Sequence, residues 1–366
     1  MPRRAPATSL VPPAVLAAAA LALTVPGSSP SAAAPPAAGQ PAPVRAANPR
    51  LAAGPVVQYG CISDSASWSG VAALYQRRAG VSVRADARGS ALARLRDERA
   101  RPVADCAYYA GPAGCKAALE GLHQAYKPRG WERIPPGLKD PGGRWWAVHT
   151  SVLALIVNTQ ALARAPVPRS WADLLKPAYR GKVAYEDPTW GGAGLTFAYG
   201  INEIMGGSGE DFGPGLAYLK ALDANVVTYP RRSVYQEVLR GRIPIWIHAD
   251  ANGYRMKLAD GGPVQVVIPA EGSFVLPSVM GMVAGAPHPR ETREYLDWLI
   301  GAEAQGELAR SFLRPVIPPA APGAPAGRLL PASEYRRVRT LDLVRMAAAS
   351  DSLKRAWLRE IRRRPG

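Results

Sequence analysis

Short apolar runs alternate with amphipathic stretches along the chain from residue 55 onwards. Apolar runs of this length are typical of buried strands, and apolar residues three or four positions apart are typical of helices. In the first part of the chain the alternating segments are, in order, 55–59, 68–79, 81–85, 90–101, 104–109 and 113–121. Strands joined by helical crossovers are parallel, so the pattern predicts an α/β fold.

One apolar run, 145–158, is longer than a strand of one compact sheet usually is. We therefore expect it to run from one lobe of the protein into a second lobe. The alternation then resumes, with strands expected at 182–186, 226–228, 243–248 and 264–268 and helices at 195–205, 211–222, 234–240, 290–300 and 341–362. A chain of 366 residues is also too long for one ordinary core and suits two lobes.

Residues 1–34 have the order of a secretory signal, with Arg3 and Arg4 before a short apolar run at 15–25 and small residues after it. The apolar run is too short to span a bilayer comfortably. No Cys follows it, so we expect a Sec-type signal peptide without lipid attachment and a periplasmic or secreted protein. Residues 35–53 are expected to form a flexible Pro/Ala leader, and an uncleaved tail is the alternative interpretation.

The composition adds a strong positive charge to this picture. The formal net charge is +17, with 48% hydrophobic and 20% charged residues. Such a surface favours anionic partners, but the basic residues are scattered and the sequence has no nucleic-acid-binding module, so no nucleic acid partner is expected. Of the three cysteines, Cys106 and Cys115 could pair across a loop in an exported protein, or all three could remain thiols.

The sequence lacks the motifs that would indicate catalysis. It has no G-x-S-x-G, no H-E-x-x-H and no phosphate-binding G-x-x-x-x-G-K-[ST]. Its four histidines are isolated from one another, and the cysteine spacing matches no zinc site. We therefore expect a protein that is not an enzyme and that has no metal and no cofactor.

Four stretches resemble a known family. Residues 170–189, SWADLLKPAYRGKVAYEDPT, are similar to the SWxDLLxPxYxGKVxxxDPT stretch of extracellular solute-binding proteins of ABC importers, which include binders of ferric iron, polyamines, phosphonates and sugar phosphates. Three further stretches, 148–158, 266–272 and 286–299, agree with the family in order and spacing.

The resemblance implies a two-lobed periplasmic-binding-protein fold, type II-like, with two crossover strands and a ligand between the lobes. The implied boundaries are lobe one at 54–152 and 270–330, lobe two at 153–269, and a C-terminal helical extension at 331–366 that packs on lobe one. The implied partners are a small-molecule ligand and an ABC permease at the membrane, and the protein is expected to be a monomer.

In open α/β sheets ligands bind beyond the carboxyl ends of the strands. The loop at 61–68 offers Ser63 and Ser65 with Trp68 beside them, although these serines could simply cap the next helix. The loop at 187–194 offers the Thr189 hydroxyl and an aromatic wall, and its glycines could form a nest of backbone N–H groups for an anion. The alternative for this loop is a tight turn. Its candidate ligand residues are Thr189, Trp190, Gly191 and Gly192.

The third loop, 248–255, offers Asp250 and Tyr254, and Asp250 could bind an ammonium group or cap the next helix. Minor candidates lie at other strand ends: Tyr109, Gly111, Thr150, Ser151 and Ser273. The hydroxyl- and glycine-rich loops and the positive charge favour a phosphate-, phosphonate- or carboxylate-bearing ligand.

Other ligands of the same fold are the alternatives. Ferric binders of the family use adjacent tyrosines in the second lobe, whereas here the only such pair is Tyr108 and Tyr109 in lobe one. A polyamine binder needs several carboxylates and an aromatic box, of which Asp64, Asp250, Trp68 and Trp190 could supply part. A ferric-complex or polyamine binder, or a sensory or surface protein without a transport role, therefore remains open.

Overall fold

The computed structural model describes residues 54–61, 66–317 and 329–362. The predicted signal peptide, the leader, Ser63 and Ser65 lie outside the described residues. No described helix is both long enough and apolar enough to cross a membrane.

The first lobe begins with the expected strand–helix alternation. Its three parallel strands are β1 (Val56–Tyr59), β2 (Val83–Asp86) and β3 (Cys106–Ala110), with β1 in the middle. The helices between and after them are α1 (Ala66–Ala79), α2 (Ala91–Asp97) and α3 (Ala113–Leu119), and the short strand β4 (His123–Gln124) follows. The Ser90 side chain caps α2 by accepting a hydrogen bond from the N–H of Ala93.

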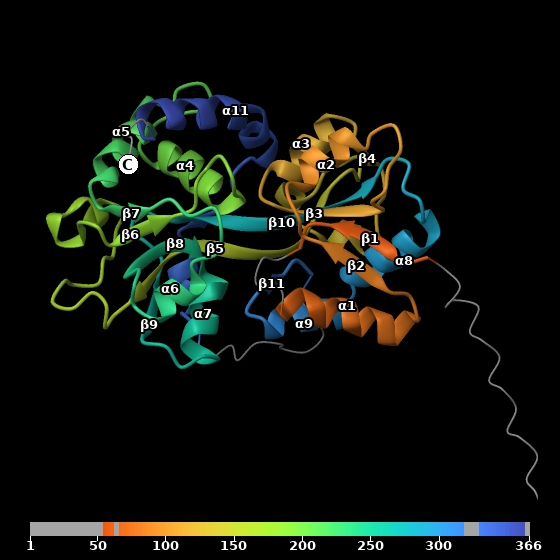
Figure 1. The fold of residues 1–366 in the computed structure, drawn as a ribbon, viewed down its shortest axis with the longest axis horizontal. Coiled ribbons are helices and arrows are strands. Elements are labelled where there is room, and N and C mark those ends of the chain that lie inside the picture. Colours follow the sequence, from red (N-terminus) through yellow and green to blue (C-terminus); the bar gives the residue numbers. More distant parts are fainter. Residues whose placement is uncertain (1–53, 62–65, 318–328, 363–366) are drawn as a thin grey trace, which may run out of the picture. The chain divides into compact units, whose positions relative to one another are not determined.

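The long apolar run forms one strand, β5 (Trp146–Asn158), that belongs to both halves of the sheet. All 13 residues are buried. Up to Val152 it pairs with β10 (Ser273–Val283), and from Leu153 it pairs with β8 and β9 of the second lobe. Figure 1 shows β5 and β10 side by side between the two groups of elements. Strand β10 begins before the apolar residues at its C-terminal end. Its first two residues, Ser273 and Phe274, pair with a short strand near the C-terminus, Val338–Arg339.

The second lobe has a smaller sheet of mixed direction. Its strands are β6 (Val183–Tyr185), β7 (Val226–Thr228), β8 (Ile245–Ala249) and β9 (Val264–Val267). Its helices are α4 (Gly192–Ile204), α5 (Gly213–Asp223), α6 (Tyr235–Leu239) and α7 (Asp250–Leu258). Short 3₁₀ helices occur at Trp131–Arg133, Pro136–Leu138, Ala172–Leu175 and Pro177–Tyr179. The main path through the sheet has the strand order β2-β1-β3-β10-β5-β8-β6-β7, and the remaining strands pair off this path.

The chain returns to the first lobe before its last helix. There it forms α8 (Pro289–Leu299), α9 (Ala302–Arg310) and the short strand β11 (Arg314–Pro315), which pairs with β5. Farther on lie α10 (Ala332–Tyr335), β12 (Val338–Arg339) and α11 (Leu343–Glu360).

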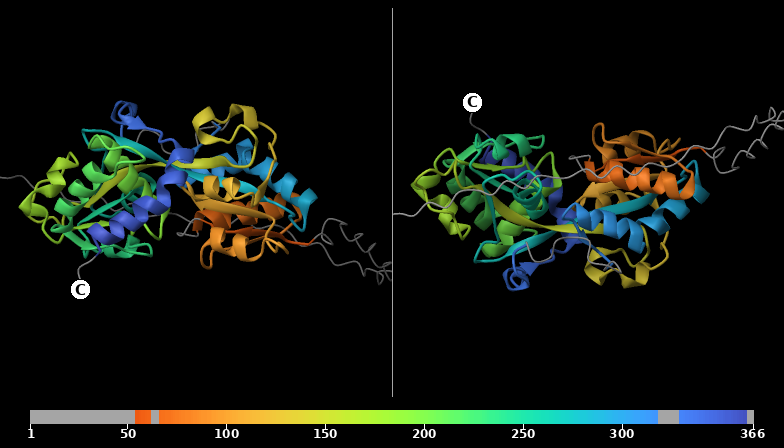
Figure 2. Two further views of the ribbon diagram at one scale, coloured as in Figure 1. Left: turned by 90° about the horizontal axis from the view of Figure 1, so that it is seen from above. Right: turned by 90° about the horizontal axis from the view of Figure 1, so that it is seen from below.

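The last helix differs from its predicted placement. We expected it to pack on lobe one, and it does contact α3, but it also packs against α4 and α5 of lobe two. The view from above shows α11 lying across both groups of elements (Figure 2). Trp357 of α11 is fully buried, and its indole N–H donates to the Tyr185 hydroxyl of β6 at 3.1 Å. The helix therefore connects the two lobes on one side of the molecule.

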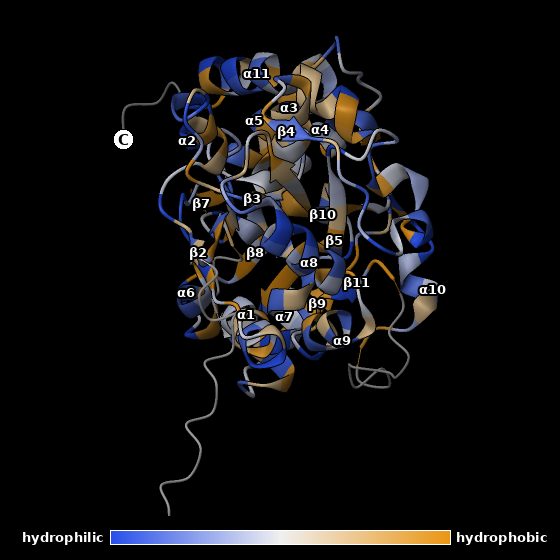
Figure 3. Ribbon diagram, turned by 90° about the vertical axis from the view of Figure 1, so that its right-hand side faces the viewer, coloured by the Kyte–Doolittle hydropathy of each residue, from blue (hydrophilic) through white to orange (hydrophobic). Residues whose placement is uncertain are grey.

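The core follows the sheet from end to end. Figure 3 shows β5 and β8 largely hydrophobic, whereas the outer helices carry both hydrophobic and hydrophilic residues. Large side chains that are fully buried occur in both lobes, among them Trp68, Trp146, Trp171, Trp246 and Trp357. Burial of aromatic area of this size is a major source of stability.

Candidate functional site: a cavity between the lobes

The cavity lies where strand ends of both lobes meet, and it has a volume of about 560 Å³. Volumes of this order accommodate a small molecule. The lining comes from the loop after β3, the middle of β5 and β10, the loop from β6 into α4, residues 231–233, the start of α7, and α11.

Six of the predicted ligand residues line this cavity, namely Tyr109, Gly111, Ser151, Trp190, Gly191 and Gly192. Trp190 is 63% exposed and supplies an aromatic wall, with the Arg231 guanidinium 5.8 Å from its ring centroid. The other described candidates are absent from the lining: Trp68, Thr150, Thr189, Asp250, Tyr254 and Ser273. Their contacts explain why.

The Thr189 hydroxyl is used within its own loop. It donates to the Asp187 carboxylate at 2.6 Å, and the backbone N–H of Thr189 donates to the same oxygen at 2.9 Å. Asp187 is fully buried and also accepts from Arg231 at 2.9 Å. Thr189 therefore fixes the turn that carries Trp190 and does not itself face the cavity.

Asp250 already has a full set of partners in the chain. Its buried carboxylate accepts two hydrogen bonds from Arg314, at 2.6 and 2.9 Å, one from the N–H of Val152 at 2.9 Å, and one from the Tyr335 hydroxyl at 3.0 Å. The Tyr254 hydroxyl meets the Tyr335 hydroxyl beside it. This carboxylate is thus neutralised by Arg314 and is not placed to hold a ligand's ammonium group.

Three candidates remain. Thr150 lies within β5, between Pro277 of β10 and Arg314 of β11. The Ser273 hydroxyl donates to the carbonyl of Leu153 in the neighbouring strand β5. The Trp68 ring packs on Tyr108, with ring centroids 5.0 Å apart. Both side chains support the strands that surround the cavity.

The glycine-rich loop does form a nest, and the chain fills part of it with its own carboxylate. Glu186 lines the cavity and accepts hydrogen bonds from the N–H groups of Ala193 at 3.0 Å and Gly194 at 3.1 Å. Burial raises the pKa of Glu186, and these two hydrogen bonds oppose that rise. A Cβ atom at Gly191 would lie 1.9 Å from the Glu186 carboxyl carbon, so a larger residue there would push this carboxylate out of the nest. The sequence indicated the nest but not its occupant, although Glu186 directly follows a predicted strand.

The two lobes touch at backbone level beside this nest. A Cβ atom at Gly192 would lie 2.5 Å from the carbonyl oxygen of Ala110 in the first lobe. Gly111, with φ +67, faces the carbonyl of Gly192 and the Thr196 hydroxyl from the other side. Glycine is therefore required for the lobes to approach this closely.

Two histidines of the cavity wall, the buried His149 and the partly exposed His248, are neutral. His149 on β5 meets the Tyr108 hydroxyl at 2.9 Å through Nε2, and burial lowers the pKa of His149 to about 3. Its Nδ1 atom has no hydrogen-bond partner among the described residues. His248 stacks on Trp246 with ring centroids 4.1 Å apart, and burial lowers the pKa of His248 to about 4. Neutral rings of this kind can donate to a ligand but cannot supply a positive charge.

The adjacent tyrosines of lobe one are engaged on opposite sides of β3. Tyr109 meets Nε2 of His123 at 2.9 Å, while Tyr108 meets His149. Burial raises the pKa of both tyrosine hydroxyls, so they remain protonated at neutral pH. The two hydroxyls are therefore directed at different partners and do not point at a common position.

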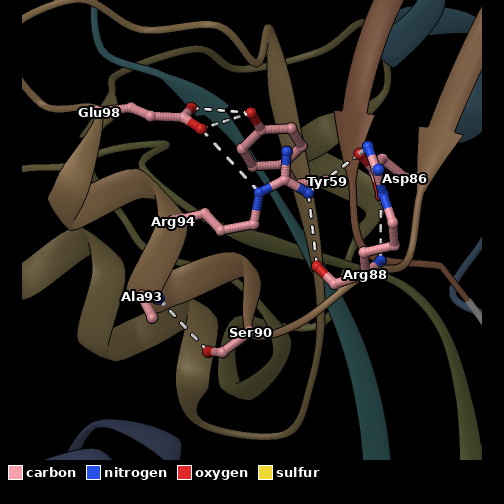
Figure 4. Close-up of polar contacts among 7 residues, drawn as sticks. All are labelled: Tyr59, Asp86, Arg88, Ser90, Ala93, Arg94 and Glu98. Carbon is pink, nitrogen blue, oxygen red and sulfur yellow. Dashed lines mark hydrogen bonds and ion pairs between the residues drawn. The ribbon is translucent and has the colours of Figure 1, made fainter.

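One rim of the cavity is held by a network that the sequence analysis did not foresee. Figure 4 shows Asp86 at the end of β2 accepting from Arg88 at 2.7 Å and pairing with Arg94 at 3.1 Å. The Arg94 guanidinium lies 3.4 Å from the centroid of the Tyr59 ring, and the Tyr59 hydroxyl donates to Glu98 at 2.8 Å. These contacts fix the turn whose residues, from Ala87 to Leu92, line the cavity.

Charged side chains give the cavity a positive balance. The basic lining residues are Arg96, Lys116, Arg231, Arg232 and Lys354, and the acidic ones are Glu186 and Asp351. Asp351 and Lys354 come from α11, which the sequence analysis had left out of the site. This contribution could not be predicted, because nothing in the local sequence pattern of a C-terminal helix indicates which surface the helix covers.

Side chains that could ligate a metal do not gather in the described part of the chain. Its His, Cys, Asp and Glu residues form no group of three that could hold an ion. Cys61, Cys106 and Cys115 are free thiols, so the alternative in which all three stay unpaired is the one the structure shows.

Two α/β lobes, joined by paired crossing strands and enclosing a cavity, are the architecture of two-lobed periplasmic binding proteins. The chain belongs to the family of bacterial extracellular solute-binding proteins, whose model matches residues 102–343. The resemblance and the fold class predicted from the sequence are thereby confirmed.

Curated relatives are distant. An uncharacterised protein of Haemophilus influenzae is 28% identical over 232 residues, which are 60% of this chain and 65% of that protein. A periplasmic protein of Salmonella typhimurium, provisionally named for binding 2-aminoethylphosphonate, is 28% identical over 230 residues, which are 60% of this chain and 64% of that protein. The chain thus spans a little under two-thirds of the length of these relatives.

Solved structures match over most of the chain. The periplasmic binding protein AfuA of Actinobacillus pleuropneumoniae, with fructose-6-phosphate bound, is 21% identical with a TM-score of 0.73, covering 85% of this chain and 99% of its own. Iron-bound HitA of Pseudomonas aeruginosa is 20% identical with a TM-score of 0.70, covering 83% of this chain and 99% of its own. At these identities the likeness establishes the fold.

Proposed function

We propose that this protein captures a small polar anion in the cavity between its lobes and delivers it to an ABC permease at the membrane. The observation that carries the proposal is the cavity itself, which both lobes line and in which five basic side chains face two acidic ones. An excess of positive charge in a partly closed site attracts anionic solutes and retains them. No bond of the ligand is made or broken in this role, so the protein is not an enzyme.

The names of the relatives support an anionic ligand. The Salmonella relative is named for a phosphonate, and the AfuA structure holds a sugar phosphate. Two contacts argue against the alternatives. The Tyr108 and Tyr109 hydroxyls are bonded to different histidines on opposite sides of β3, which disfavours joint binding of a ferric ion, and Asp250 is paired with Arg314, which disfavours a polyamine.

Binding would be coupled to movement of the lobes. Contacts from both lobes to one ligand favour the closed arrangement, because the ligand binds that state better than the open one. The contact of Gly192 with Ala110 marks where the lobes meet on closing. The closed protein, exported by the signal at 1–34 to the periplasm or beyond the cell, would dock as a monomer on its permease.

A thermal-shift screen of the purified protein tests the ligand class. The panel contains 2-aminoethylphosphonate, fructose 6-phosphate, inorganic phosphate, a dicarboxylate, spermidine and ferric citrate. We expect the unfolding temperature to rise with at least one phosphonate or phosphate, since a ligand present at 100 times its Kd adds about 2.7 kcal/mol to the stability. A shift with spermidine alone would contradict the proposal.

Small-angle scattering with the best ligand tests the mechanism. We expect the radius of gyration to fall at saturating ligand, and unchanged scattering would show that capture does not proceed by lobe closure. Analysis of the solution by mass spectrometry adds a control, since chemical conversion of the bound ligand would show catalysis and overturn the assignment as a binding protein.

A further inference from the structure

Three cations from three helices meet on one wall of the cavity. Arg96 lies on α2, Lys116 on α3 and Lys354 on α11, and all three line the cavity. Helix α3 contacts both of the other helices, which brings the three side chains together. The clustering arises from elements that are far apart in the sequence.

Two of these cations have carboxylate partners. Arg96 forms a two-pronged pair with Glu120, at 2.6 and 2.7 Å, within the first lobe. Lys116 pairs at 2.6 Å with Asp351 of α11, whose side chain is 55% exposed. Lys116 itself is only 21% exposed, but the solvent-facing Asp351 carboxylate can turn away from it into water and leave the ammonium to another anion.

Lys354 is the cation without a partner. Its half-buried ammonium forms no hydrogen bond or ion pair with the part of the chain that the structure describes. Burial lowers the pKa of Lys354; the nearby Asp351 carboxylate opposes this, and Lys116 and Arg96 add to it. An anion beside it would remove this electrostatic cost.

We propose that Lys354 and Lys116 bind the doubly charged end of the cavity's ligand, a phosphate monoester or phosphonate dianion, so that α11 is part of the binding site. Without a ligand, the Asp351 carboxylate occupies the position of that dianion beside Lys116. The ligand displaces this carboxylate when it binds. The charge count supports a dianion, because two ammonium groups then face the ligand while Arg96 keeps Glu120. This inference rests on the proposed function and names the end of the ligand that each lysine contacts.

The test compares affinities of three variants by calorimetry, with 2-aminoethylphosphonate, fructose 6-phosphate and inorganic phosphate as probes. Lys354→Met is expected to weaken binding of the dianions about tenfold or more, since a charge-assisted hydrogen bond contributes about 1.5–3 kcal/mol. Arg355→Met is the matched control on the same helix, because Arg355 is exposed and does not line the cavity. Asp351→Asn is expected to strengthen binding several-fold by freeing Lys116.

A second measurement, thermal unfolding without a ligand, distinguishes the loss of a binding contact from misfolding of the variant. Without a ligand, Lys354→Met is expected to unfold at the same temperature as the unaltered protein or a higher one, because a partly buried unpaired charge is removed. Retention of full affinity by Lys354→Met, or a loss on Asp351→Asn, would overturn the subsite while the proposed function stands. Binding of only uncharged or cationic solutes by the unaltered protein would overturn both.

Discussion

At the scale of single residues, the cavity wall consists of groups whose charge is set by burial and by close partners. Glu186 is held by two N–H groups of α4, and Asp187 by Arg231. His149 and His248 are neutral because the loss of hydration around each ring lowers its pKa. The side chains still able to meet an incoming anion are therefore mainly the lysines and arginines, together with N–H donors of the neutral rings.

The glycine at the contact between the lobes gives one prediction. Gly192→Ala would place a Cβ atom 2.5 Å from the Ala110 carbonyl oxygen, which belongs to backbone and cannot turn away. We expect the lobes of this variant to stop short of closure, with affinity for the best anion reduced at least tenfold and no compaction in scattering. Gly306→Ala is the control, because a Cβ atom there meets no atom within 4 Å. Equal affinities of the two variants would disprove the role of this contact.

The buried histidines predict an acid-sensitive fold. Burial lowers the pKa of His123 to about 4, that of His149 to about 3 and that of His248 to about 4, whereas in the unfolded chain each lies near 6.5. The unfolded state then binds more protons below pH 6.5, so stability is complete above that pH and falls as the pH drops towards 4. Each histidine contributes at most about 1.4 kcal/mol per pH unit.

Urea denaturation at pH 7.5, 6.0 and 5.0 measures this dependence. We expect the free energy of unfolding to decrease over this series, and His149→Gln to reduce the steepness of the decrease. The comparison uses the slope and not the absolute stability, because the substitution also removes the hydrogen bond to Tyr108. A free energy that stays constant between pH 7.5 and 5.0 would rule out the histidines as the cause.

At the scale of elements, α11 has the largest consequence for the site. Its Trp357 packs edge-on against Tyr229, with ring centroids 5.2 Å apart, and donates to Tyr185. We expect Trp357→Ala to cost about 3–5 kcal/mol of stability, the usual loss for a buried tryptophan. Leu358→Ala, at a side chain that is 41% exposed, serves as the control and should change stability by about 0.5 kcal/mol or less. Urea midpoints provide the measurement, and similar midpoints would show that α11 is only loosely attached.

Much of the element order was predictable from the sequence, because it depends on local periodicity. The long run at 145–158 predicted the crossing strand. Helix α9 was not foreseen. The site was less predictable, because its decisive pairs join residues far apart in sequence, such as Lys116 with Asp351 and Asp250 with Arg314. A local pattern shows that a carboxylate follows a strand, but not which cation meets it.

At the scale of the whole molecule, the junction of the lobes depends on one buried ion pair. Asp250 at the start of α7 binds Arg314 of β11 and the N–H of Val152, the residue at which β5 changes its partner strands. We expect Arg314→Met to cost about 3–5 kcal/mol, because the Asp250 carboxylate is left buried without its cation. Arg310→Met is the control, since its pair with Glu307 is largely exposed. Chemical denaturation compares the two, and equal stability would show that Asp250 does not need Arg314.

The path of the chain through the sheet also orders the steps of folding. Strand β10 lies between β3 and β5, so the first lobe, although it begins the described chain, has no complete sheet until residue 283 has been supplied. The strands of the second lobe are all available once residue 267 has emerged. A chain that enters a new compartment from its N-terminus would thus have every strand of the second lobe available before β10 joins β3 to β5 in the first lobe.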